Sequence, residues 1–99
     1  MINNSVKEKN ITNDIIKYLK SLENCFVWKE HGGMYGTAGI PDIICCIEGK
    51  FIAFEVKTEK GKLTKLQEIA IHRIRDAKGE AFKVTSLEEV KKILENMEV

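Results

Sequence analysis

The stretch from Gly39 to Lys57 constrains the fold more than any other part of the chain. It contains two apolar runs, Asp42–Ile47 and Phe51–Val56, on either side of Glu48-Gly49-Lys50. Apolar runs of this length, rich in Ile, Val and Phe and divided by a glycine-containing turn, are typical of a β-hairpin. We therefore predict two antiparallel strands here, joined by a loop of either two or four residues.

Both loop lengths set the same register, in which Asp42 lies opposite Glu55. Because side chains alternate between the two faces of a strand, Lys57 shares the face of Glu55. Like charges directly opposite each other destabilise a sheet. A divalent cation removes that penalty, because hard cations take carboxylate oxygens as ligands. The register therefore predicts a cation site at one end of the hairpin.

Composition limits the chain to one small domain, which we expect to span residues 1–99. The net charge of +1 does not indicate a nucleic-acid binder, so any basic surface must be local. One local excess follows the hairpin and consists of Lys57, Lys60, Lys62 and Lys65, opposed only by Glu59. A charge run alone is usually a solvated loop, but its position next to the acidic pair favours contact with phosphates.

The three cysteines, Cys25, Cys45 and Cys46, lack the ligand spacing of a zinc site. We interpret them as small apolar core residues in a reducing compartment, with the adjacent Cys45 and Cys46 on opposite faces of their strand. The sequence has no signal peptide and no apolar run of membrane-spanning length. We therefore expect a cytoplasmic protein that does not enter a membrane.

A helix is predicted over about residues 6–22, because Ser5 and Glu8 fit a capping box and apolar residues then recur at helical spacing. Glu8 lies on the apolar stripe of this helix. It either completes the cap or points inward as a third carboxylate at the site.

A first strand is predicted over Cys25–Lys29, followed by a glycine-rich loop from His31 to Gly39 that lacks the ending of a P-loop. The glycines either allow close approach of the backbone to a ligand or only allow turns. His31 is either a phosphate contact or an ordinary loop histidine.

A second helix is predicted from the Thr64/Gln67 capping box to about Lys78, with Gly79 as its stop. Gln67 lies within the buried stripe, where a polar group needs a partner. It either bonds locally as a cap or reaches the Glu55 end of the sheet.

A last strand over 81–85 and a helix led by a Ser86/Glu89 capping box complete the order α-β-β-β-α-β-α. Both faces of the hairpin are apolar, so we expect helices to cover both. The helix between the third and fourth strands predicts that these two strands are parallel.

Pro41-Asp42, followed on the next strand by Glu55-Val56-Lys57, resembles the PD-(D/E)XK nuclease motif. More of the chain is similar to the VRR-NUC (virus-type replication–repair nuclease) family, in its stand-alone viral and bacterial members. The resemblance covers about residues 6–95 and rests on the Gly39–Asp42 start, the Glu55–Thr58 strand end, the Gly61/Leu63/Gln67 helix entry and an early helical Glu8. It implies an α/β, restriction-endonuclease-like core with a mixed sheet flanked by helices.

The resemblance also implies roles for single residues. Asp42 and Glu55 would ligate Mg²⁺ or Mn²⁺ with the Val56 backbone carbonyl, and Glu8 is a further candidate ligand. Lys57 matches the catalytic lysine and Gln67 the helix glutamine. Apart from the resemblance, the position of Lys60, Lys62 and Lys65 next to the acidic pair predicts that they hold the DNA backbone without reading its sequence, and His31 is a further candidate contact.

The implied activity is hydrolysis of DNA phosphodiester bonds by a homodimer similar to Holliday-junction resolvases. A nicking or flap endonuclease with the same site is one alternative. A catalytically silent DNA-binding module of the same fold is another, and a structural α/β domain with solvated Asp42 and Glu55 is a third.

Overall fold

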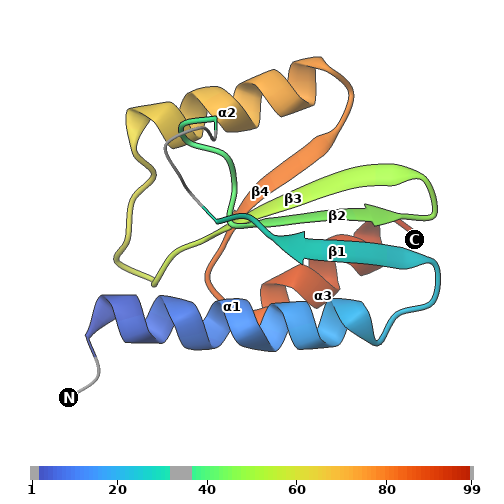
Figure 1. Cartoon of the computed structure of the whole chain (residues 1–99), viewed down its shortest axis with the longest axis horizontal. Coiled ribbons are helices and arrows are strands. Elements are labelled where there is room, and N and C mark those ends of the chain that lie inside the picture. The colour runs from blue at the N-terminus through green and yellow to red at the C-terminus, as the bar shows by residue number, and fades with distance from the viewer. Residues whose placement is uncertain (1–2, 32–36, 99) are drawn as a thin grey trace.

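The computed structural model describes residues 3–31 and 37–98, and within them the elements follow the predicted order. The bounds are α1 (Asn4–Lys20), β1 (Cys25–Lys29), β2 (Ile43–Ile47), β3 (Lys50–Val56), α2 (Lys65–Asp76), β4 (Glu80–Val84) and α3 (Leu87–Asn96). The sheet has the order β1-β2-β3-β4, with antiparallel pairing up to β3 and parallel pairing of β3 with β4 (Figure 1). The predicted mixed α/β fold is confirmed.

Three segments of the chain, residues 1–2, 32–36 and 99, lie outside the described residues. The predictions made for the glycines in the middle of the glycine-rich loop fall there. In the described parts, 3–31 and 37–98, no helix is both long and apolar enough to span a membrane.

The β2–β3 hairpin has the shorter of the two expected loops, because Ile47 pairs with Lys50. Glu48 and Gly49 form the turn with φ angles of 50° and 86°. Positive φ at both central residues is what a type I′ hairpin turn requires. The register predicted from the sequence is therefore confirmed.

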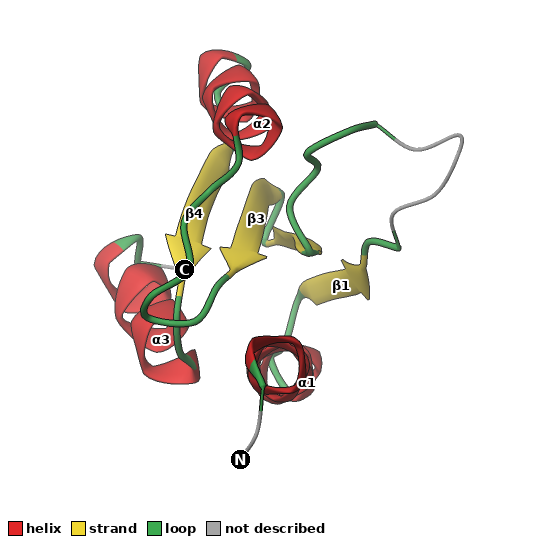
Figure 2. Ribbon diagram, turned by 90° about the vertical axis from the view of Figure 1, so that its left-hand side faces the viewer, coloured by secondary structure: helices red, strands yellow, loops and turns green. Residues whose placement is uncertain are grey.

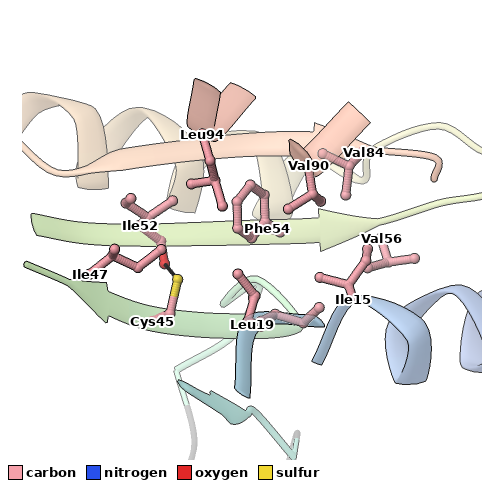
Figure 3. Packing of buried hydrophobic residues seen from close by; sticks show 11 residues of the cluster. Ile15, Leu19, Cys45, Ile47, Ile52, Phe54, Val56, Val84, Val90 and Leu94 are labelled. Carbon is pink, nitrogen blue, oxygen red and sulfur yellow. Dashed lines mark hydrogen bonds between the residues drawn. The ribbon is translucent and has the colours of Figure 1, made fainter. Parts of the chain in front are cut away.

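The main core lies between the sheet and the helix pair α1 and α3 (Figures 2 and 3). Ile15 and Leu19 of α1 pack there with Phe54 of β3, and all three side chains are fully buried. Val90 and Leu94 of α3 belong to the same cluster. Because both helices bury their apolar stripes here, this face of the sheet is covered.

The opposite face carries a smaller core, made by Ile44, Ala53, Ile71 and Ala81 beneath α2. Within the described residues, α2 covers only part of this face of the sheet. Phe26, Trp28 and Phe51 are 69%, 41% and 43% exposed, and they share the α2 side of the sheet, as follows from the pairings of β1 with β2 and β2 with β3. The prediction that helices cover both faces therefore holds fully only for the α1 and α3 side.

The cysteines divide between the two faces as strand alternation requires. Cys45 is buried in the main core, where its thiol donates to the Ile52 carbonyl at 3.3 Å (Figure 3). Cys46 faces the other way and is exposed. The prediction of a core residue is therefore right for Cys45 and wrong for Cys46.

Helix α1 begins earlier than predicted, because Asn3 is its N-cap and accepts from the Val6 backbone N–H at 2.9 Å. The predicted Ser5/Glu8 capping box is therefore wrong. Asn and Ser are equally good N-caps, so local preference could not choose between them. Glu8 lies beyond the first turn and is free of any capping role.

Helix α2 begins with the predicted capping box of Thr64 and Gln67, but it ends differently. Lys78 takes the left-handed conformation with φ 74°, and the N–H groups of Lys78 and Gly79 donate to the carbonyls of Arg75 and Ile74. This pair of bonds is a Schellman motif with lysine in the glycine position. Gly79 serves packing instead, since an added Cβ would lie 3.0 Å from Ile74 Cγ2.

The segment from β4 to α3 also differs in detail, since β4 spans Glu80–Val84, one residue earlier than predicted. Ser86 caps α3 by accepting from the Glu89 N–H at 3.2 Å. The Glu89 carboxylate accepts from the Thr85 N–H at 2.8 Å and from the Thr85 hydroxyl. The predicted capping box is therefore only half formed.

Candidate active site

Asp42 and Glu55 face each other at the end of the hairpin, on the side of the sheet that α2 covers. The β2–β3 pairing ends with Ile43 opposite Phe54, and its continuation puts Asp42 opposite Glu55. Asp42 Oδ2 accepts from the Val56 backbone N–H at 2.8 Å, which holds this carboxylate across the hairpin. Glu55 is only 2% exposed. The hairpin therefore places the buried carboxylate of Glu55 next to the half-buried carboxylate of Asp42.

The electrostatic consequence is an unusually basic Glu55. Burial raises its pKa to about 9, and a hydrogen bond to Asp42 and the negative charge of Asp42 act in the same direction. The Lys57 charge opposes this shift, and the Glu8 charge adds to it by the smallest amount. Two carboxylates in this position cannot both ionise cheaply at neutral pH without a compensating positive charge.

Gln67 connects the pair to α2. Its Nε2 donates to Glu55 Oε2 at 3.4 Å, while its Oε1 accepts from the Thr64 backbone N–H at 2.9 Å. Both roles that the sequence left open for Gln67 are thus realised together. Because the capping bond fixes which end of the amide faces the sheet, Gln67 presents a donor to Glu55.

The other oxygen of Glu55 has no such partner. Within the described residues, Glu55 Oε1 is buried and no N–H or O–H group donates to it, so either a proton shared with Asp42 or an added cation must compensate the pair. A buried acceptor without a partner costs free energy, and such groups need an explanation. Carboxylate oxygens are ligands for hard divalent cations such as Mg²⁺ and Mn²⁺, so the donor set of Asp42 and Glu55 fits such an ion.

Glu8 stands apart from this pair, because α1 packs on the other side of the sheet (Figure 2). Its carboxylate is near enough for its charge to act on Glu55. In residues 3–31 and 37–98, however, no three His, Cys, Asp or Glu side chains gather closely enough to hold a metal ion. The structure therefore brings two carboxylates together and leaves Glu8 outside the pair.

Lys57 follows β3 directly, and its backbone N–H donates to the Val84 carbonyl at 3.0 Å. Its side chain is half-buried, and its charge lowers the pKa of Glu55. The other predicted DNA contacts, Lys60, Lys62, Lys65 and His31, are all exposed. Within the described parts of the chain, none of these four side chains hydrogen-bonds to the carboxylate pair, so their roles stay predictions.

Gly39 has a role at the site that sequence reasoning missed. It adopts φ 80°, and an added Cβ would lie 2.3 Å from the Leu66 carbonyl oxygen and 2.9 Å from the Gln67 nitrogen. Its close approach is therefore to the first turn of α2. This contact joins the segment that carries Asp42 to the helix that carries Gln67. The glycine three residues before Asp42 was the signal in the sequence.

Comparison with known proteins agrees with this geometry. No protein-family model matches the sequence, and no curated protein is detectably similar to it. A solved structure titled "VRR_NUC domain" superposes with a TM-score of 0.76 at 26% identity, covering 90% of this chain and 95% of that chain. Another, titled "VRR_NUC domain protein", has a TM-score of 0.72 at 16% identity and covers 89% and 84%.

Proposed function

The chain is a VRR-NUC domain, and on that premise we propose that it is a metal-dependent DNA endonuclease that hydrolyses phosphodiester bonds. The observation that carries the proposal is the paired Asp42 and Glu55, with one buried Glu55 oxygen left without a hydrogen bond. Two facing carboxylates in an apolar sheet must share either a proton or a cation, and we propose that a cation occupies this position in the active protein. We further propose that residues 1–99 form one nuclease domain.

Asp42, Glu55 and the Val56 backbone carbonyl would hold Mg²⁺ or Mn²⁺, with Glu8 as an outer candidate ligand. When bound, such an ion supplies a water of lowered pKa and neutralises negative charge at the scissile phosphate. Gln67 keeps Glu55 oriented through its Nε2 donor.

Lys57 supplies a fixed positive charge beside Glu55, where it can orient the attacking water or pair with a phosphate oxygen. The exposed Lys60, Lys62 and Lys65 would hold the DNA backbone without reading its sequence, and His31 would add to them.

For the substrate, we propose branched DNA, cut by a resolvase-like homodimer in DNA repair, in the cytoplasm of a bacterial or phage-infected cell. The exposed Phe26, Trp28 and Phe51 on one side of the sheet support self-association, because large apolar side chains gathered on one face are typical of an interface. Analytical ultracentrifugation of the wild type and of Trp28→Ser tests this dimer. We expect the wild type to sediment as a dimer and the variant as a monomer.

The function is tested with a panel of four-way junction, flap, nicked, supercoiled and single-stranded DNA in Mg²⁺ or Mn²⁺. We expect preferential cutting of the junction, and no cutting by Asp42→Asn or Lys57→Ala. The exposed Glu95→Gln, which removes a charge from α3, is the matched control and should cut normally.

The rival functions predict other outcomes of the same panel. Preferential cutting of the nicked duplex or flap would favour the nicking or flap endonuclease. Binding of DNA without turnover by wild type and Lys57→Ala alike would favour the silent binding module. Absence of both binding and cutting would favour a structural domain.

A further inference from the structure

A groove of about 600 Å³ lies between the first half of α1 and the loop after β3. Polar side chains from three separate elements line it. They are Asn4, Lys7 and Asn10 of α1, Thr58, Glu59 and Lys60 of the loop, and Thr85 after β4, and the apolar Ile11 lies among them.

Two residues next to the groove connect it with the acidic pair, although α1 packs on the other side of the sheet. Glu8, whose charge reaches Glu55, follows Lys7 and lies one helical turn from Asn4 on the same face of α1. On the opposite wall, Thr58 follows Lys57 in the chain. A polymer that passes around this end of the sheet could therefore contact both the acidic pair and the groove.

The charges around the groove favour an anion. Lys7 and Lys60 are exposed cations on facing walls, and Glu59 is the acidic residue that lines it. The N-terminus of α1, a helix of 17 residues, opens here with no acidic residue in its first turn. The positive end of the helix dipole is therefore not neutralised locally.

An independent observation comes from Thr58. Its side chain is 8% exposed, and among the described residues its hydroxyl oxygen has no hydrogen-bond partner. Buried hydroxyls are normally paired, and a hydroxyl can donate to a phosphate oxygen. An unpaired hydroxyl in the wall of a groove that carries two lysines and one glutamate favours a ligand that accepts hydrogen bonds.

We propose that this groove binds a phosphate of the DNA strand next to the one that is cut, with Lys7 and Thr58 as residues of that subsite. The proposal rests on the function proposed above. The same chemistry would accept an internal phosphodiester or a terminal 5′-phosphate, so substrates are compared with and without 5′-phosphates.

The test is Lys7→Ala, with Lys20→Ala in the last turn of the same helix as the matched control. DNA binding is measured by fluorescence anisotropy in EDTA from low to moderate salt, and KM and kcat are measured in Mg²⁺. We expect Lys7→Ala to weaken binding about five- to tenfold and to lower the slope of log K against log salt by about 1. KM should change more than kcat, and Lys20→Ala should match the wild type.

Thr58→Val gives a second readout, because it removes the hydroxyl at nearly constant volume. We expect weaker DNA binding with no loss of Tm, since the hydroxyl has no partner within the described fold. If Thr58→Val loses the same affinity for DNA with and without a 5′-phosphate, the ligand is an internal phosphodiester. If it loses affinity only for the 5′-phosphorylated DNA, the ligand is the terminal phosphate.

The outcomes separate this proposal from the function on which it rests. A wild type that cuts DNA while Lys7→Ala binds like Lys20→Ala, in affinity and in salt slope, overturns the phosphate subsite alone. A wild type that neither binds nor cuts DNA overturns the nuclease function, and the subsite with it.

Discussion

Glu55→Gln should make the metal-free protein more stable while abolishing cleavage, because glutamine has the shape of a protonated glutamic acid. Its carbonyl oxygen can accept from Gln67 Nε2, as Glu55 Oε2 does now. Its amide N–H can donate to the carboxylate of Asp42, which lies within hydrogen-bond range of Glu55. The substitution therefore removes the repulsion and keeps the packing.

The pKa of Glu55 sets the size of this effect. It is raised from an ordinary 4.5 to about 9 in the folded state, chiefly by burial. The folded protein therefore holds this proton more tightly than the unfolded chain does. Below pH 4.5 the raised pKa of Glu55 does not lower the stability of the fold. Between pH 4.5 and about 9 the loss of stability grows with pH, and above about 9 it stays constant. At pH 7 the penalty is at most about 3.5 kcal/mol, from ~1.4 kcal/mol for each pH unit between 4.5 and 7.

The assay is urea unfolding in EDTA at pH 4, 7 and 8.5. We expect Glu55→Gln to exceed the wild type by about 1–3 kcal/mol at pH 7, by more at pH 8.5 and by nothing at pH 4. Glu59→Gln, on an exposed side chain, should follow the wild type at each pH.

A lower stability of Glu55→Gln at pH 7 would refute this reasoning. It would mean that Lys57 and the surrounding donors already compensate the ionised pair, so that no cation is required. Addition of Mn²⁺ completes the experiment, since a ligand at 100 times its Kd stabilises the fold by about 2.7 kcal/mol. We expect that gain in the wild type and its loss in Glu55→Gln.

Three further substitutions probe other parts of the molecule. Asp42→Asn should abolish Mn²⁺-dependent stabilisation, measured by thermal unfolding, and unchanged stabilisation would remove Asp42 from the ligand set. Gly39→Ala should cost about 2–4 kcal/mol and reduce cleavage, because its Cβ would meet the Leu66 carbonyl at 2.3 Å. Gly49→Ala, also at positive φ but with nothing within 4 Å, should cost only about 1 kcal/mol, and equal losses would argue against the Leu66 contact. Leu19→Ala should cost about 2–5 kcal/mol in urea unfolding, since the side chain is fully buried between α1 and the sheet.

Much of the candidate site follows from local sequence rules. Turn chemistry at Glu48-Gly49 sets a two-residue loop, and strand alternation then puts Asp42 opposite Glu55. The capping box that begins α2 is likewise local, since Thr64 and Gln67 satisfy each other's backbone donors. Such features were predictable because neighbours in the chain decide them.

Other features depend on residues that are distant in the chain. The choice of Asn3 over Ser5 as N-cap is one, because both residue types suit that position. The exposure of Phe26 and Trp28 is another, since periodicity does not say how far α2 extends over the sheet. The extent of helix cover is a matter of tertiary packing.

By itself, the sequence determined the order of the elements, the hairpin register and the meeting of two carboxylates, because these depend on short-range geometry. Only the tertiary structure decided that Glu55 keeps one buried oxygen unpaired and that Gly39 packs against Leu66. It alone brings Lys7 and Thr58 to one groove. Burial and contact between distant segments exist only once the helices have packed on the sheet, and no periodicity in the chain encodes them directly.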